Sequence, residues 1–136
     1  MTNNADKQAR KYLKNKGRNK GRFVALPYSM LESEAWKDLS PQAALIFIEL
    51  KRRYNGGNNG EISLSCREAA EVAHCGKGTA NKRLVELAEY GFIKPNEKGY
   101  FHNRHASTWI LTCECFGKSA PSNEWKEYRK NKTPCL

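Results

Sequence analysis

Residues 64–93, "LSCREAAEVAHCGKGTANKRLVELAEYGFI", decide the fold that this sequence predicts. The stretch opens on Ser65, followed three residues later by Glu68, which is the capping-box spacing that begins a helix. Small residues then recur at helical spacing over 66–73, and they would let a second helix approach closely. Glycine and polar residues interrupt the pattern over 74–77. We therefore expect a short helix that ends in a tight turn.

Helical periodicity resumes over 78–90. Ala80, Leu84 and Leu87 are spaced so that they share one face of a helix, as core residues do. Gly91 follows at the position where a helix end favours a left-handed backbone. The turn is thus expected to join two helices.

The glycine-lysine-glycine run in this turn also raises the alternative of a nucleotide-phosphate loop. Such a loop needs Gly-x-x-x-x-Gly-Lys-Ser/Thr after a buried strand, so that successive backbone N–H groups converge on phosphate oxygens. Here Glu71 stands where the first glycine is required, and Gly78 follows Lys77 in place of Ser or Thr. The segment before the turn is helical in pattern, and we reject the phosphate loop.

The segments on either side complete a small α+β, mainly helical fold. The alternating residues of 61–64 predict a short strand. Residues 92–94 and 108–116 predict the two strands of a hairpin that encloses a long polar loop. Upstream, 31–39 has the spacing of a short helix with Trp36 on its apolar side.

A more apolar helix is expected to follow. Ser40 and Pro41 form a helix start, with serine as the N-cap and proline at the first helical position. The residues that follow are apolar nearly all round, which is typical of a helix at the centre of a small fold. Lys51, Arg52 and Arg53 close it, and they complement the negative end of the helix dipole.

The net charge of +10 lies at the two ends of the chain. Residues 1–22 hold eight Lys and Arg against one Asp, residues 117–136 hold five against two Glu, and 23–116 are neutral. We expect a disordered basic arm, one folded domain over 23–116, and a basic C-terminal extension with a helical turn at 122–128. Basic ends suit a polyanion such as nucleic acid, although they also keep a protein soluble.

The C-terminal extension also contains Trp125 and Tyr128. Docking of these rings on the domain is our first expectation, ahead of a dimer contact and ahead of stacking on nucleic-acid bases.

The order of helix, glycine turn, helix and hairpin resembles the winged helix-turn-helix superfamily, over about residues 24–116. The upstream stretch "FVALPYSMLESEAWKDLSPQAALIFIELKRRYNG" is similar to the amino-terminal part of winged-helix proteins of plasmids, phages and integrated mobile elements, replication initiators included. The resemblance implies that the second helix enters the major groove of DNA while the hairpin, or wing, contacts the backbone or the minor groove.

The candidate DNA contacts follow from the part of the second helix that turns away from Ala80. Asn81 has the groups that pair with adenine, and Lys82 those that reach guanine, while Thr79 lies one turn earlier on the same outer surface. Lys77 and Gly78 would bring a cation and backbone N–H groups to a phosphate at the helix start. An ordinary solvated helix face is the alternative.

Four further cations are candidates of lower rank. Arg83 flanks the second helix and suits either a phosphate or a salt bridge, and Arg67 in the first helix is within reach of a phosphate. Lys98 and Arg104 lie in the wing loop, which is basic or neutral apart from Glu97, although any exposed hairpin tip has a similar composition.

We expect no catalytic site, metal or cofactor. His102 with His105 and Cys113 with Cys115 have spacings that are unusual for structural zinc, and two cysteines on one strand face more often pack as small apolar groups. No hydrophobic run approaches the length of a membrane span, and a bacterial cytoplasmic, nucleoid-associated protein is the default.

The function that these features predict is sequence-specific binding of double-stranded DNA by a transcriptional regulator of a bacterial mobile element. The alternatives are a winged-helix module that binds a partner protein and a plasmid or phage replication initiation factor. The neutral charge of residues 23–116 keeps the protein-binding alternative open. The sequence leaves open whether a homodimer binds, which DNA site is bound, and the direction of regulation.

Overall fold

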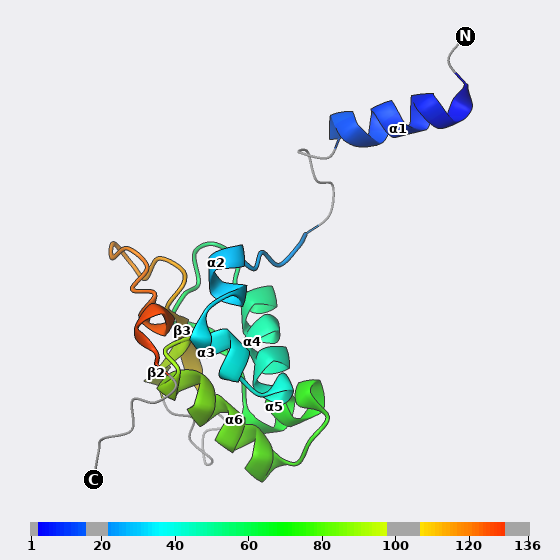
Figure 1. Cartoon of the computed structure of the whole chain (residues 1–136). Helices are drawn as coiled ribbons and strands as arrows, with labels where there is room; N and C mark the ends of the chain where they lie inside the picture. The colour runs from blue at the N-terminus through cyan, green and yellow to red at the C-terminus, as the bar shows by residue number, and fades with distance from the viewer. Residues whose placement is uncertain (1–2, 16–21, 98–106, 130–136) are drawn as a thin grey trace.

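The computed structural model describes residues 3–15, 22–97 and 107–129 (Figure 1). Within them the chain is an α+β protein that is mainly helical, with one small antiparallel sheet. The helices and the sheet enclose a single hydrophobic core. No helix in this part of the chain combines the length and apolar character needed to cross a membrane.

The first helix, α1, spans Asn4–Asn15, where the sequence predicted no regular structure. Its interior has no glycine or proline and is rich in Ala, Lys, Gln and Arg, which are good helix formers. The side-chain oxygen of Asn3 accepts the backbone N–H of Asp6 at 2.8 Å, as an N-cap does. No described residue of α1 belongs to the hydrophobic core.

Two short helices replace the single helix expected over 31–39. They are α2 at Tyr28–Leu31 and α3 at Glu34–Asp38. Ser33 separates them, because its hydroxyl donates to the carbonyl of Met30 at 2.5 Å and accepts the N–H of Trp36 at 3.2 Å. One serine therefore ends the first helix and begins the second, a local competition that the apolar spacing does not reveal.

Helix α4, at Pro41–Arg53, lies at the centre of the fold, as the sequence predicted. Ser40 caps it by accepting the N–H of Ala43 at 3.2 Å. Its basic end does more than complement the helix dipole, since all three side chains also pair with carboxylates. The fully buried residues of α4 are Ala43, Ile46, Phe47 and Leu50.

The helix pair predicted from residues 64–93 is present. Helix α5 spans Cys66–Ala73 and begins with the Ser65–Glu68 capping box, and α6 spans Lys77–Glu89. The left-handed residue at the end of α5 is His74, with φ of 56°, and not a glycine of the turn. Gly91, with φ of +88°, does occupy a left-handed position just after α6.

The sheet has three strands, in the order β1-β3-β2, and all pairs are antiparallel. Strand β1 is Ile62–Ser63, β2 is Ile93–Glu97 and β3 is Thr108–Leu111. The expected hairpin is thus β2 with β3, and β1 extends it by pairing Ile62 with Trp109. The wing loop between β2 and β3 lies outside the described residues.

Strand β3 is shorter than the predicted 108–116. Asn59 bonds to its last residue through both side-chain groups: Oδ1 accepts the N–H of Leu111 at 2.7 Å, and Nδ2 donates to the Leu111 carbonyl at 2.9 Å. These backbone groups are therefore used by a loop and not by another strand. Cys113 and Cys115 lie beyond the strand, so the expectation that they share one strand face is wrong.

The C-terminal extension packs against the domain. Its helical turn, the 3-10 helix η1, spans Glu124–Glu127 and places Trp125 in the core at 4% exposure. The Trp125 ring stacks on Phe92 with centroids 6.4 Å apart and 8° between planes. Phe92 also contacts Phe47 and Trp36, so the extension completes an aromatic cluster.

Candidate nucleic-acid interface

The two sides of α6 differ sharply in burial. Ala80 and Leu87 are fully buried and Leu84 is 2% exposed, so the helix is anchored along one side. Gly91 and the buried Thr112 fix the chain beyond its C-terminal end, because the Thr112 hydroxyl donates to the carbonyl of Gly91 at 2.6 Å. The helix is thus anchored in the core along its length, from Ala80 to Leu87, and held beyond its C-terminal end.

The opposite side of α6 carries the residues predicted to contact DNA. Lys77, Gly78, Asn81 and Lys82 are exposed, and Thr79 is half-buried. Neither lysine forms an ion pair with any described residue. The structure therefore brings these five residues together on one accessible surface, which we call the α6 surface.

The start of α6 presents bare backbone. Gly76 is the N-cap and no side chain caps the helix, so its first N–H groups have no acceptor within the helix. A Cβ atom added at Gly76 or at Gly78 would meet no atom of the described residues within 4 Å, and neither residue has a left-handed φ. The fold therefore does not require glycine at either position, although a closely approaching ligand would.

Asn81 keeps most of its hydrogen-bonding capacity. Within the described residues, its one contact is a weak one, in which the Cys66 thiol donates to Oδ1 at 3.8 Å. The amide is therefore free to offer a donor and an acceptor together, which is the pair that an adenine edge requires.

Arg83 is engaged with the protein itself. Its Nε donates to Gln42 Oε1 at 3.1 Å, and its Nη1 pairs with Glu86 Oε1 at the same distance. Of the two roles predicted for Arg83, the described structure contains the salt bridge. The side chain is 31% exposed, so it borders the α6 surface without being part of it.

Glu86 has a role that the sequence did not reveal. Its Oε2 accepts both the backbone N–H of Ser40, at 3.0 Å, and the Ser40 hydroxyl, at 2.8 Å. One carboxylate thus joins α6 to the start of α4, while its other oxygen holds Arg83. The two partners are 46 residues apart in the chain, and no local pattern connects them.

Arg67 lies near the start of α6. It is 78% exposed and has a loose contact of 3.8 Å with Glu71, one turn later in α5. Arg67 and Lys77 line the same shallow hollow at the helix-turn-helix corner, together with Glu71, His74 and Gly76. The predicted wing residues Lys98 and Arg104, and the histidines His102 and His105, lie outside the described residues.

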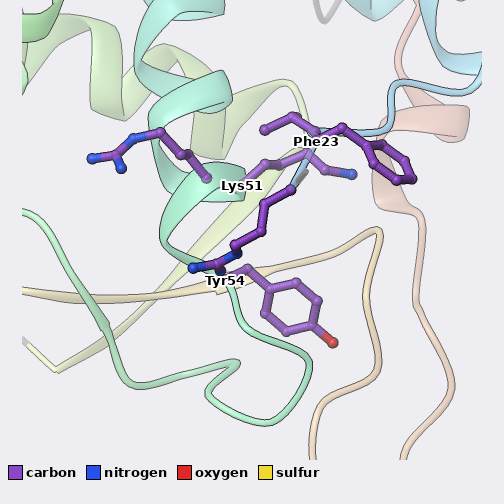
Figure 2. A pocket seen from close by; sticks show the side chains of 6 residues that line it. Phe23, Lys51 and Tyr54 are labelled. Atoms are coloured by element: carbon purple, nitrogen blue, oxygen red, sulfur yellow. The ribbon is translucent and has the colours of Figure 1, made fainter. Parts of the chain in front are cut away.

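A second hollow lies at the C-terminal end of α4 (Figure 2). Its lining residues are distant in sequence from the α6 surface. Arg22, Phe23, Lys51 and Tyr54 line it. Lys51 Nζ is 3.4 Å from Glu114 Oε1 and 3.8 Å from Cys113 Sγ. This charge is therefore already neutralised.

The other cation of α4 in this hollow is paired as well. Arg52 forms two hydrogen bonds to the carboxylate of Glu49, at 2.6 and 2.8 Å. The hydrogen bond from Arg52, supported by Arg53 and opposed by burial, holds the pKa of Glu49 below its usual value. The carbonyl end of α4 also disfavours anions. We therefore assign no phosphate to Lys51 or Arg52.

Among the described residues, no group of three or more His, Cys, Asp or Glu side chains is arranged to hold a metal ion. Burial, opposed by the charge of Lys51, raises the pKa of the Cys113 thiol. That thiol is therefore less reactive than an exposed one.

Comparisons with known proteins identify no family. No protein-family model matches the sequence, and no curated protein matches it. A solved structure described as the N-terminal domain of a DNA-binding protein is similar to this chain with a TM-score of 0.49 and 18% sequence identity. The similarity covers 76% of this chain and 84% of that one.

Proposed function

We propose that this chain is a winged helix-turn-helix protein that binds a specific double-stranded DNA sequence, with α6 in the major groove. The observation that carries the proposal is the α6 surface. Its exposed lysines have no ion pair among the described residues, its asparagine is almost free of partners, and its opposite side is firmly buried.

The arrangement of the elements supports the same proposal. Helices α5 and α6 are joined by a three-residue turn, and the β2–β3 pair follows α6 directly. This is the order in which a winged helix-turn-helix places its scaffold helix, its recognition helix and its wing.

Within the α6 surface, two residues are assigned to bases. Asn81 pairs with adenine through N6 and N7, and Lys82 donates to guanine O6 or N7. Thr79, half-buried one turn before Lys82, supplies a further short polar contact. These contacts carry the sequence preference, because they reach groups that differ between base pairs.

The phosphate contacts are assigned to the helix-turn-helix corner and to the arm. The uncapped start of α6, with Lys77 and Gly78, receives one phosphate, and Arg67 lies across the same hollow. Lys7, Arg10 and Lys11 of α1 are exposed and spaced along one side of that helix, which suits a backbone contact without base preference.

The cellular role that fits this binding is regulation of transcription in a bacterial mobile element, without enzymatic activity. The sequence resemblance of the segment upstream of α5 to proteins of plasmids and phages supports this setting.

Selection of bound duplexes from a random pool, followed by titration with variants, tests the proposal. Lys82→Ala is expected to weaken binding to the selected site by about 1–3 kcal/mol and to relax the preference at one base pair. Lys37→Ala is the matched control, because Lys37 is also exposed but lies on α3.

Gly78→Ala separates folding from binding. The new methyl group meets nothing within 4 Å in the part of the chain that the structure describes, and alanine is a better helix former by up to about 1 kcal/mol, so the free energy of unfolding should rise. Binding should nevertheless fall, because the methyl group keeps a phosphate from the backbone. Unchanged binding by both Lys82→Ala and Gly78→Ala would contradict the assignment of α6.

A protein-interaction module is the second candidate. It is favoured by the neutral charge of residues 23–116 and by two exposed aromatic rings before and within α2, Phe23 at 72% and Tyr28 at 82% exposure. A folded chain lacking residues 1–22 should still be retained on a DNA column if α6 binds DNA. Complete loss of retention would favour this second candidate.

A further inference from the structure

The α6 surface continues beyond the residues assigned to DNA into an apolar region. Val85, at 48% exposure, leaves an apolar side chain open to solvent. It follows Asn81 by four residues and Lys82 by three, so the three side chains are neighbours on one side of α6. The base-contacting residues therefore adjoin an apolar one.

Val85 lines a hollow between α6 and the β-sheet. Asn81 and Ala88 belong to the same lining on the helix, while Pro95 and Trp109 form the opposite wall. Pro95 and Trp109 are cross-strand partners in β2 and β3. This hollow, which we call the Val85 hollow, thus has one wall from the helix and one from the sheet.

Both walls are fixed in place. Trp109 donates its indole N–H to the carbonyl of Leu64 at 3.2 Å, which holds the ring against the domain. On the helix side, Leu84 is 2% exposed and anchors the turn that carries Val85. Contacts within the domain therefore hold a residue of each wall.

The position of the hollow favours DNA over a second protein. Asn81 is shared between the hollow and the α6 surface, and Lys82 is adjacent. A protein covering Val85 would also cover these two polar groups and would need to supply partners for them. The major groove supplies such partners in the same plane as an apolar group, the 5-methyl of thymine.

We propose that the Val85 hollow receives the 5-methyl group of a thymine and thereby adds a second element to the sequence preference. This inference rests on the proposed function of α6. Four residues of helix advance about 6 Å, and bases along a strand are about 3.4 Å apart. The thymine therefore lies within about two base pairs of the adenine that Asn81 contacts.

Glu89 sets the limit of the contact. It is exposed on the far side of the same lining, eight residues or about 12 Å along the helix from Asn81. Its carboxylate would repel the phosphates of DNA that extended further along α6. The contact between the duplex and α6 thus includes Val85 and does not extend to Glu89.

A double-mutant cycle, carried out with the full-length chain and the duplex recovered by selection, tests the proposed methyl contact. One change replaces each thymine in turn by deoxyuridine, which lacks only the methyl group, and the other is Val85→Ala. Losing one buried methyl group should weaken binding about four-fold. The wild type should show this loss at one thymine near the Asn81 adenine, and Val85→Ala should show no further loss there.

Leu45→Ala is the matched control, since Leu45 is a 42% exposed apolar residue on α4 outside the Val85 hollow. It should keep the wild-type response to deoxyuridine. A Val85→Ala chain that binds as tightly as the wild type and responds equally to deoxyuridine would overturn the inference while leaving the function of α6 intact.

Two other results are also decisive. A change of oligomeric state on Val85→Ala, seen by sedimentation equilibrium without DNA, would assign the hollow to a second copy and overturn the methyl contact. Failure of the selection to enrich any duplex would overturn the proposed function together with this inference.

Discussion

The two basic ends of the chain have similar compositions and opposite relations to the fold. Residues 1–22 and 117–136 both carry net positive charge and few apolar residues. Yet no described residue of α1 joins the core, whereas η1 places Trp125 inside it. The difference comes from two aromatic side chains of the C-terminal end, and it shows that charge alone does not mark a segment as a free arm.

The C-terminal extension is tied to the domain at several points. The Tyr128 ring lies against Tyr90 in a tilted arrangement, with centroids 4.4 Å apart and 34° between planes, and its hydroxyl donates to Asp38 at 3.1 Å. The backbone N–H of Asn123 donates to the carbonyl of Thr112 at 2.9 Å. These contacts tie the extension to the C-terminal end of α6, to α3 and to the chain after β3.

The largest expected effect is on stability, from Trp125→Ala. Truncating a buried tryptophan should lower the free energy of unfolding by about 3–5 kcal/mol, because the aromatic cluster is left with a cavity. Urea unfolding followed by circular dichroism measures it.

The matched change at the other end is deletion of residues 1–15, which should alter the unfolding free energy by less than about 0.5 kcal/mol. Equal losses of unfolding free energy from the two changes would show that both ends contribute equally to the stability of the fold.

The next effect is on binding and belongs to the N-terminal end. Replacing Lys7, Arg10 and Lys11 by alanine should weaken binding to every duplex alike, on the order of ten-fold to a hundred-fold at low salt. The slope of log affinity against log salt should fall by about one for each lysine or arginine removed. Fluorescence anisotropy at several salt concentrations measures both, and a loss confined to the selected site would show that α1 contacts bases.

A smaller effect than that of Trp125→Ala tests one contact of the C-terminal end. Tyr128→Phe keeps the ring on Tyr90 but loses the hydrogen bond to Asp38, which should cost about 0.5–1.5 kcal/mol of unfolding free energy.

The effect of Tyr128→Phe also depends on pH. Burial, together with the neighbouring Tyr90 and Asp38 side chains, raises the pKa of Tyr128 above its usual value of 10.0. Because the folded pKa is the higher one, this stabilisation is fully present below about pH 10 and is lost as the pH rises above it. The Tyr128→Phe chain should therefore lose less unfolding free energy than the wild type between pH 9 and pH 11. Parallel plots of unfolding free energy against pH for the two chains would show that the Tyr128 hydroxyl makes no stabilising contact.

The helix boundaries that depend on local signals could be predicted from the sequence. The caps at Ser40 and Ser65, and the left-handed Gly91, act within a few residues, and each lies where its neighbours indicate. Ser33 shows the limit of this approach, because a serine that both ends and begins a helix is hidden within an otherwise regular apolar pattern.

Long-range contacts explain most of what the sequence did not reveal. The pairing of β1 with β3 and the early end of β3 at Asn59 depend on residues about 50 positions apart, as does the bond between Glu86 and Ser40. The α6 surface, in contrast, follows from helix periodicity around buried Ala80, so its exposed members could be named in advance. Whether they contact DNA stays a prediction.

The carboxylate of Glu86, which Ser40 and Arg83 share, restricts how the sequence of this protein can change during evolution. It holds the start of α4 through Ser40 and the flank of α6 through Arg83, so neither helix can be shifted without disturbing the other. Homologous chains should therefore exchange residues 40 and 86 as a pair. New binding preferences should arise by replacing side chains on a stationary α6, and tilting of the helix should be rare.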